Sequence, residues 1–123
     1  MAEKNETGKQ GESVARQYLE GKGYKVLTTN WRFHHYELDI IASNNEELVI
    51  IEVKTRSDNY LLAPETAVDN RKIRRIVAAS DAYTRKHNIK LPVRFDLLCL
   101  IKKGQSFEIE HIEDAFFAPM NIR

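Results

Sequence analysis

The sequence predicts an α/β fold in which helices cover both faces of one mixed central sheet. Two segments with helical spacing of apolar residues and five segments rich in β-branched and aromatic residues lead to this prediction. Their order along the chain is helix, three strands, helix, strand and strand, or αβββαβ with an added edge strand. Helices separated in this way cover opposite faces of a sheet. With 123 residues, a single domain is expected over residues 1–123.

The first helix is expected to run from about residue 7 to Gly21, after a polar and frayed segment 1–6. One face of this helix is apolar and should pack on the core, through Val14, Ala15, Tyr18 and Leu19. Glu12 stands four residues before Arg16 and could form a helical ion pair with it.

The first strand is expected at residues 24–32, where β-branched and aromatic residues are frequent. Trp31 is interpreted as a core residue rather than a platform for base stacking. His34 and His35 follow in a turn, and imidazoles suit zinc. Adjacent residues of an extended chain point to opposite sides, which argues against zinc. We interpret both as loop residues that could lie near a phosphate.

The stretch from Glu37 to Lys54 predicts a β-hairpin, because two runs of Ile and Val flank the polar residues 43–47. A four-residue loop pairs positions whose numbers add up to 91, which places Asp39 opposite Glu52 and Glu37 opposite Lys54. One face of the hairpin then carries the acids above Ile41 and Ile50. The other face is expected to carry Leu38, Ile40, Ala42, Val49, Ile51 and Val53.

The expected acidic pair predicts a binding site for a divalent cation. Cross-strand Cβ atoms lie roughly 4.5 to 5.5 Å apart, so ionised Asp39 and Glu52 would repel and at least one pKa would rise. Carboxylates and backbone carbonyls are ligands that Mg²⁺ prefers. Lys54 stands on the same face, where it could stabilise charge on a phosphate. The alternative is that these charges mark strand ends, with Glu37 and Lys54 forming a surface ion pair.

The second helix is expected from about Asp69 to His87, after a loop at residues 57–64. Lys72 lies at the N-terminal end of its buried stripe, where its amine could reach the carboxylates or instead snorkel to solvent. A basic cluster lies outside this stripe near the start of the helix and consists of Arg71, Arg74 and Arg75. It is either a solvated face or a set of phosphate contacts.

Two further strands are expected at 91–101 and 106–112, the second as an edge strand. Asp96 should pair with Arg94, two residues before it, or cap a neighbour. The apolar tail 115–120 should pack on its own body or on a second copy, which suggests a homodimer.

Composition narrows the function classes. The net charge of +1 is not that of a strongly basic nucleic-acid binder, so any such binding must be local. The absence of an apolar run of transmembrane length and of a signal peptide predicts a cytoplasmic protein without membrane contact. The lone Cys99 lies in an apolar strand and is interpreted as a core residue.

The sequence also resembles a known family. Residues 37–42, Glu-Leu-Asp-Ile-Ile-Ala, and residues 52–56, Glu-Val-Lys-Thr-Arg, resemble the hallmark of the PD-(D/E)xK superfamily of restriction-endonuclease-like nucleases. The YraN-type family within it is the most similar, with matching flanks at 11–15 and 94–96, and archaeal-type Holliday-junction resolvases are similar in arrangement. Leu38 replaces the Pro of the hallmark, as in the YraN type, and Tyr36 stands where the family has Gly.

This resemblance implies a restriction-endonuclease-like αβββαβ core and an endonuclease that uses Mg²⁺ or Mn²⁺ to hydrolyse DNA, including branched or damaged DNA. The implied metal ligands are Asp39, Glu52 and the carbonyl of Val53. The implied catalytic residues are Lys54, Glu12 and Glu37. The implied nucleic-acid contacts are Arg56, Arg71, Lys72, Arg74 and Arg75. Two alternatives are an inert nucleic-acid-binding module of the same fold and a structural interaction protein.

Overall fold

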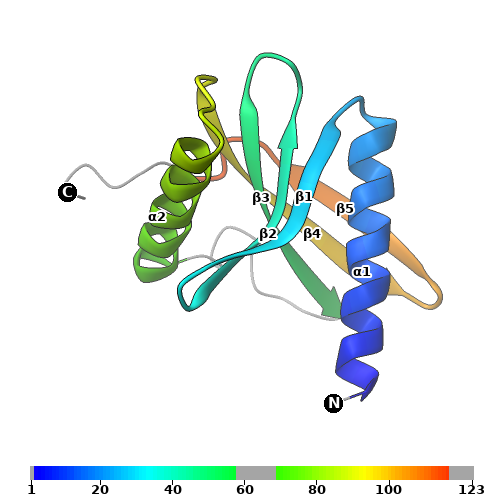
Figure 1. Ribbon diagram of the computed structural model, residues 1–123. Coiled ribbons are helices and arrows are strands. Elements are labelled where there is room, and N and C mark those ends of the chain that lie inside the picture. The colour runs from blue at the N-terminus through cyan, green and yellow to red at the C-terminus, as the bar shows by residue number, and fades with distance from the viewer. Residues whose placement is uncertain (1, 58–68, 117–123) are drawn as a thin grey trace.

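Helices lie on opposite sides of a central sheet in the computed structural model, which describes residues 2–57 and 69–116, with side chains described from residue 10 on (Figure 1). The elements are α1 (Ala2–Gly21), β1 (Lys25–Phe33), β2 (Tyr36–Ser43), β3 (Leu48–Ser57), α2 (Asn70–Lys86), β4 (Val93–Lys103) and β5 (Ser106–Ile112). The sheet order is β1-β2-β3-β4-β5, and only the β3–β4 pair is parallel. The predicted mixed α/β fold is therefore confirmed.

Element ends differ from the prediction mainly at the N-terminus. Helix α1 begins at Ala2 rather than near residue 7. Ala, Glu and Lys favour helix, and the glycine at position 8 costs only about 1 kcal/mol, so no residue in this segment stops the helix. Helix α2 matches the prediction closely: Asp69 is its N-cap and accepts a hydrogen bond from the Lys72 N–H at 2.9 Å.

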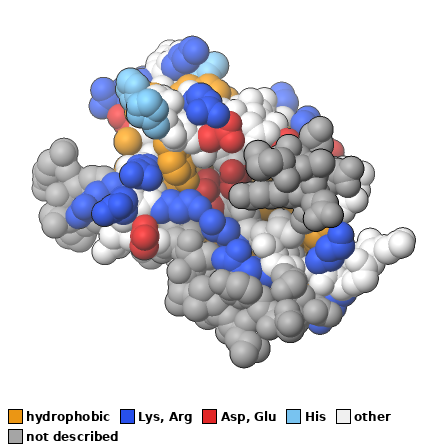
Figure 2. All heavy atoms as spheres, turned by 90° about the horizontal axis from the view of Figure 1, so that it is seen from below, with side chains coloured by type: hydrophobic (Ala, Val, Ile, Leu, Met, Phe, Trp, Pro, Cys, Tyr) orange, Lys and Arg blue, Asp and Glu red, His pale blue; other side chains and the backbone are white. Residues whose placement is uncertain are grey.

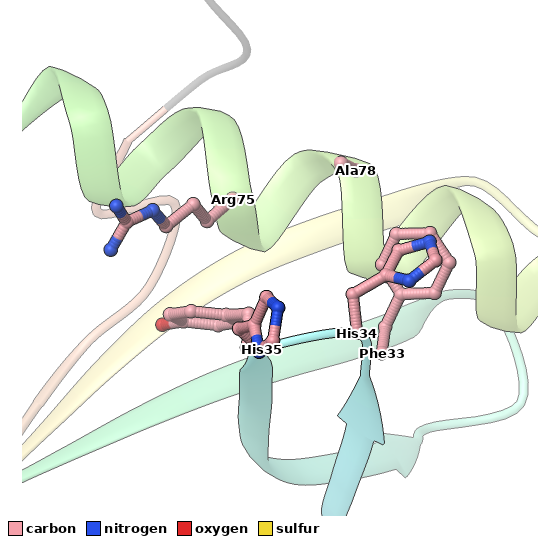
Figure 3. Close-up of a pocket in the computed structure, with 6 residues that line it drawn as sticks. Phe33, His34, His35, Arg75 and Ala78 are labelled. Atoms are coloured by element: carbon pink, nitrogen blue, oxygen red, sulfur yellow. The ribbon is translucent and has the colours of Figure 1, made fainter.

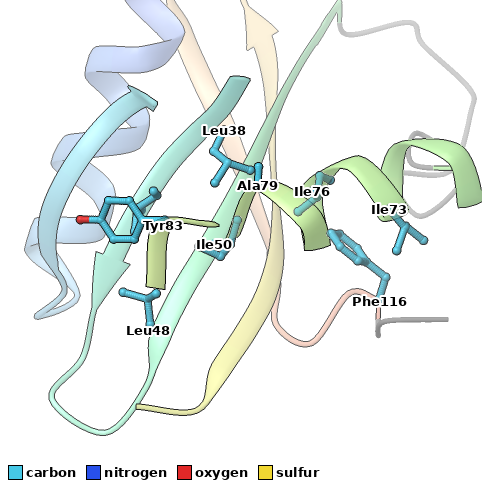
Figure 4. Close-up of a cluster of buried hydrophobic side chains, with 9 residues drawn as sticks. Leu38, Leu48, Ile50, Ile73, Ile76, Ala79, Tyr83 and Phe116 are labelled. Carbon is cyan, nitrogen blue, oxygen red and sulfur yellow. The ribbon is translucent and has the colours of Figure 1, made fainter. Parts of the chain in front are cut away.

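Each helix packs on one face of the sheet and covers a cluster of buried apolar side chains there. Helix α1 covers a cluster formed by Ala15, Leu19, Ile40, Ala42, Val49, Ile51, Leu98 and Leu100. Helix α2 covers the other face in a cluster formed by Leu38, Ile41, Leu48, Ile50, Ile73, Ile76, Ala79, Tyr83 and Phe116 (Figure 4). Trp31 packs edge-on against Tyr83, with ring centroids 5.2 Å apart, which confirms it as a core residue.

The predicted side of Leu38 was wrong. Leu38 packs under α2 with Ile41, whereas Ile40 packs under α1. Strict alternation would put Leu38 and Ile40 on one face. Thr29 pairs with Ile40 and Trp31 with Leu38, so Asn30 lies opposite Asp39. Asn30 has a φ of 53°, in the left-handed region, and this residue interrupts the alternation beside the acidic pair.

A buried polar network ties α1, β4 and β5 together. Arg94 donates to both oxygens of Asp96, at 2.9 and 2.8 Å, which confirms the predicted pair. His111 Nε2 lies 2.7 Å from Asp96 Oδ2, and its Nδ1 lies 3.1 Å from the hydroxyl of Tyr18. The hydrogen bonds from His111 and Arg94 hold the pKa of Asp96 below its ordinary value against the effect of burial. This network joins the edge strand to the first helix.

Tyr18→Phe should lower the free energy of unfolding by about 0.5 to 1.5 kcal/mol, because it removes one partly buried hydrogen bond to His111. Urea denaturation measures the loss. The control is Glu20→Gln, which breaks only the exposed helical pair with Arg16 and should cost at most about 0.5 kcal/mol. Equal midpoints for wild type and Tyr18→Phe would show that the network contributes nothing at this position.

Within residues 2–57 and 69–116, no helix is both long enough and apolar enough to cross a membrane. Phe116 is buried in the α2 cluster and stacks on Phe95 with ring centroids 5.4 Å apart. The first part of the apolar tail therefore packs on its own body. The rest of the tail, 117–120, and the loop at 58–64 lie outside the described residues.

Candidate functional site

Strands β2 and β3 separate at the predicted acidic pair. The pairs Ile40–Ile51, Ile41–Ile50, Ala42–Val49 and Ser43–Leu48 all add up to 91, which confirms the predicted register. Beyond Ile40 the backbone pairing of the two strands ends. There the side chain of Asp39 takes over, because its Oδ2 accepts a hydrogen bond from the Val53 N–H at 2.8 Å. This hydrogen bond fixes Asp39 next to Glu52, where the two strands diverge.

Glu52 is a buried carboxylate with one oxygen unpaired among the described residues. Its exposed fraction is 1%. Its Oε1 accepts a hydrogen bond from the hydroxyl of Tyr36 at 2.9 Å and lies 3.7 Å from Lys72 Nζ. Its Oε2 has no hydrogen-bond partner in the described part of the chain. Burial, and then the charge of Asp39, raise the pKa of Glu52 to about 7.

Burial also raises the pKa of Asp39, against the hydrogen bond from Val53 and the charges of Lys72 and Lys54. Two interacting carboxyl groups thus both have raised pKa values. An additional cation would favour their charged forms.

Two lysines stand beside these acids. Burial, and then the hydrogen bond and charge of Lys72, lower the pKa of Lys54 to about 8. Lys72 reaches from the first turn of α2 to Glu52, as one of the two interpretations of this residue predicted. An amine with a pKa near 8 can hold or release a proton close to neutral pH.

The other predicted acids, Glu12 and Glu37, lie on α1 and β2 and have other partners. Glu12 Oε1 accepts a hydrogen bond from Asn30 Nδ2 at 2.9 Å, so α1 is tied to the residue opposite Asp39. Glu37 does not lie opposite Lys54. It pairs with Arg32 across β1 and β2, and its Oε2 lies 3.3 Å from Arg32 Nη2. The β2–β3 ladder ends before Glu37, which removes the expected partner.

Basic side chains surround this end of the sheet. Arg71, Arg74 and Arg75 are exposed on the first turns of α2, and Arg56 is half-buried on β3. Arg56 follows Lys54 at the spacing of one strand face. Figure 2 views the molecule from this end and shows Lys and Arg side chains gathered around a small group of acidic ones.

Comparison with known proteins places the chain in a family. The profile of the family described as "Uncharacterised protein family UPF0102" matches residues 11–100. The chain belongs to this family. It is 64% identical over 119 residues to a "UPF0102 protein" of Parabacteroides distasonis, which covers 97% of this chain and 98% of the relative. It is 51% identical to a "UPF0102 protein" of Bacteroides thetaiotaomicron over 98% of this chain and 99% of the relative.

In the described part of this UPF0102 chain, no three His, Cys, Asp or Glu side chains come together as metal ligands. Glu12 accepts a hydrogen bond from Asn30. The acids at the place where β2 and β3 separate are therefore Asp39 and Glu52. A cation there would need backbone and water oxygens as its other ligands. Mg²⁺ binds in that way, through one or two carboxylates and several waters.

Two positions of this UPF0102 site were missed by sequence reasoning. Tyr36 donates a hydrogen bond from its hydroxyl to Glu52, whereas in the sequence it stood out only as a replacement for the Gly of the family. Asn30 links Glu12 to β1. The sequence gives only a weak indication for Asn30, namely that Asn is one of the few residues that tolerate a positive φ. Tyr36 carries no signal in the sequence, because its contact is made across two strands.

Proposed function

We propose that this protein is a metal-dependent nuclease of the PD-(D/E)xK superfamily that hydrolyses phosphodiester bonds in DNA. The sequence resemblance supports the proposal, and so does the set of side chains at the fork of β2 and β3. The observation that carries it is Glu52, a buried carboxylate whose Oε2 lacks a hydrogen-bond partner among the described residues.

A buried carboxylate oxygen without a partner costs stability. Asp39 beside it adds repulsion and raises the pKa of Glu52 further. A purely structural role gives no reason to place two acids together in this way, whereas a divalent cation would satisfy both. Asp39 and Glu52 would hold Mg²⁺ or Mn²⁺, and the carbonyl of Val53 is the predicted third ligand.

Each of the remaining residues has a distinct role in this proposal. When bound, the metal would polarise the phosphate and lower the pKa of a bound water. Lys54 would place a positive charge against the phosphate and hold or release a proton at its Nζ. Tyr36 and Lys72 would orient Glu52 through Oε1, which leaves Oε2 free for the metal. Glu12 would act through Asn30, as a positioning residue.

Arg71→Ala with Arg74→Ala should weaken DNA binding mainly at low salt. Each lost phosphate contact lowers the slope of log affinity against log salt by about 1. A fluorescence anisotropy titration on duplex DNA from 50 to 200 mM salt measures both effects.

The matched control for this double variant is Lys86→Ala with Lys90→Ala. It removes the same charge from exposed positions at the far end of α2 and just beyond it. Its salt dependence should stay close to that of wild type. Equal slopes for wild type and the Arg71 and Arg74 double variant would show that this basic surface only faces solvent.

A second candidate function is nucleic-acid binding without turnover. Lys54 and Lys72 balance the charges of Asp39 and Glu52, so the site can be neutral without a metal. Incubation of wild type with linear, nicked, flapped and four-way-junction DNAs in Mg²⁺ or Mn²⁺ separates the two functions. The nuclease proposal predicts metal-dependent products on at least one DNA. Tight binding with no product on any DNA supports the inert module.

A further inference from the structure

A pocket adjoins the candidate site, between α2 and the turn that joins β1 to β2 (Figure 3). Its volume is about 330 Å³, within the range of ligand pockets. We call it the ring pocket, because four of its six lining residues carry rings; the lining is Phe33, His34, His35, Tyr36, Arg75 and Ala78. Tyr36 belongs to both places, since it lines the ring pocket and its hydroxyl donates to Glu52.

The walls of the ring pocket suit a flat aromatic ligand. The rings of Phe33 and His34 lie with their centroids 4.2 Å apart and their planes tilted by 58°, so the two neighbouring rings offer two differently oriented faces to a ligand. His34 and His35 are exposed and can therefore be reached by a ligand. Figure 3 shows the imidazoles of the turn facing the helix that carries Arg75 and Ala78. Stacking on rings holds nucleobases without regard to sequence.

The charge of Arg75 and the position of the pocket beside Glu52 narrow the class of ligand further. Arg75 is exposed on the helix side of the ring pocket, where a guanidinium can contact a phosphate. A single tyrosine separates the ring pocket from Glu52. A ligand with an aromatic ring and neighbouring phosphates, one of them at the carboxylates, is a nucleotide within a strand. In a continuous duplex the bases are stacked and paired, so an unpaired base enters a lateral pocket at a lower cost in free energy than a paired one, which must first be flipped out.

We propose that the ring pocket binds an unpaired nucleobase of the nucleic acid whose phosphate reaches Glu52 and Lys54. This inference rests on the proposed function and deepens it. The substrate class is then DNA with a single-stranded or unpaired nucleotide beside the phosphate that is cut. Continuous duplex should be the poorer ligand.

A binding experiment with 2-aminopurine tests this inference. Three DNAs are compared with wild-type protein without divalent metal: a duplex with one unpaired 2-aminopurine, the same duplex with an abasic site there, and the continuous duplex. Stacking in the ring pocket should quench the 2-aminopurine fluorescence and tighten binding about tenfold over the other two DNAs. Equal affinity for all three DNAs, or no binding of any, would overturn the inference.

His34→Asn tests the pocket itself. His34 has a φ of 55°, which Asn tolerates, so the turn should keep its conformation while one ring is lost. The preference for the unpaired base should fall to about twofold or less, with the affinity for continuous duplex unchanged. The control is His87→Ala, which removes an exposed ring at the C-cap of α2 and should behave as wild type. A full preference retained in His34→Asn contradicts the assignment of the pocket.

The two proposals fail in different ways. Quenching and a tenfold preference for the unpaired base, without cleavage in Mg²⁺, would contradict the nuclease proposal and support the base pocket. Metal-dependent cleavage with no preference for the unpaired base and no quenching would contradict the base pocket and support the nuclease proposal.

Discussion

Lys54→Met should slow DNA cleavage by on the order of 10² to 10³, the loss found when comparable electrostatic donors are removed. Metal affinity should stay the same or rise, because the variant removes a positive charge beside Asp39 and Glu52. The protein should remain folded, since Lys54 is only half-buried. Single-turnover cleavage and calorimetric Mn²⁺ titration measure the two effects.

Asp39→Asn should lose metal binding and cleavage together, because it removes a charged ligand. Its fold should survive, since Asn can still accept the hydrogen bond from the Val53 N–H. Lys90→Met is the control for both variants, at an exposed position away from the site, and should match wild type in both measurements. Cleavage by Lys54→Met at the wild-type rate would show that Lys54 is not catalytic.

Glu52→Gln should raise the stability of the metal-free protein at pH 8. The pKa of Glu52 is raised from its ordinary value of 4.5 to about 7, so the folded protein keeps a proton that the unfolded chain releases. Stability therefore falls as the pH rises from about 4.5 to 7 and stays reduced above. Removing the charge should recover about 1 to 3 kcal/mol at pH 8, less than the full shift because the amide leaves donors unpaired.

The difference between Glu52→Gln and wild type should be much smaller at pH 5, where Glu52 is largely protonated in the folded protein. Denaturation at pH 5 and 8, with Glu110→Gln as an exposed control on β5, measures this. Mg²⁺ at tenfold its dissociation constant should stabilise wild type by about 1.4 kcal/mol and Glu52→Gln by much less. A variant less stable than wild type at pH 8 without metal would contradict a strained acidic pair.

Local patterns predicted most of the fold. The length of the polar segment 43–47 fixed the hairpin register, and four observed pairs agree with it. The helix start near Asp69 was predicted from helical spacing, and it agrees with the N-cap that the structure shows there. Lys72 stood out as a cation on an apolar stripe, and it reaches Glu52. In each case the deciding information lies within a few residues of chain.

Contacts between distant segments could not be predicted in the same way. Leu38 lies on the face opposite to the predicted one, and nothing in the residues around Asn30 shows that Asn30 takes a positive φ. The end of the β2–β3 ladder gives Glu37 the partner Arg32 in place of Lys54. The network of Asp96 needs Tyr18 and His111 from two other elements. Each of these depends on how whole elements twist and pack.

A crystal structure grown with Mn²⁺ tests the central claim most directly, because the anomalous signal of Mn²⁺ locates the ion without reference to activity. The proposal predicts a peak at the fork of β2 and β3, bonded to Glu52 Oε2 and to a carboxylate oxygen of Asp39. Fully occupied Mn²⁺ elsewhere in the crystal, with Glu52 Oε2 bonded only to protein or water, would contradict it.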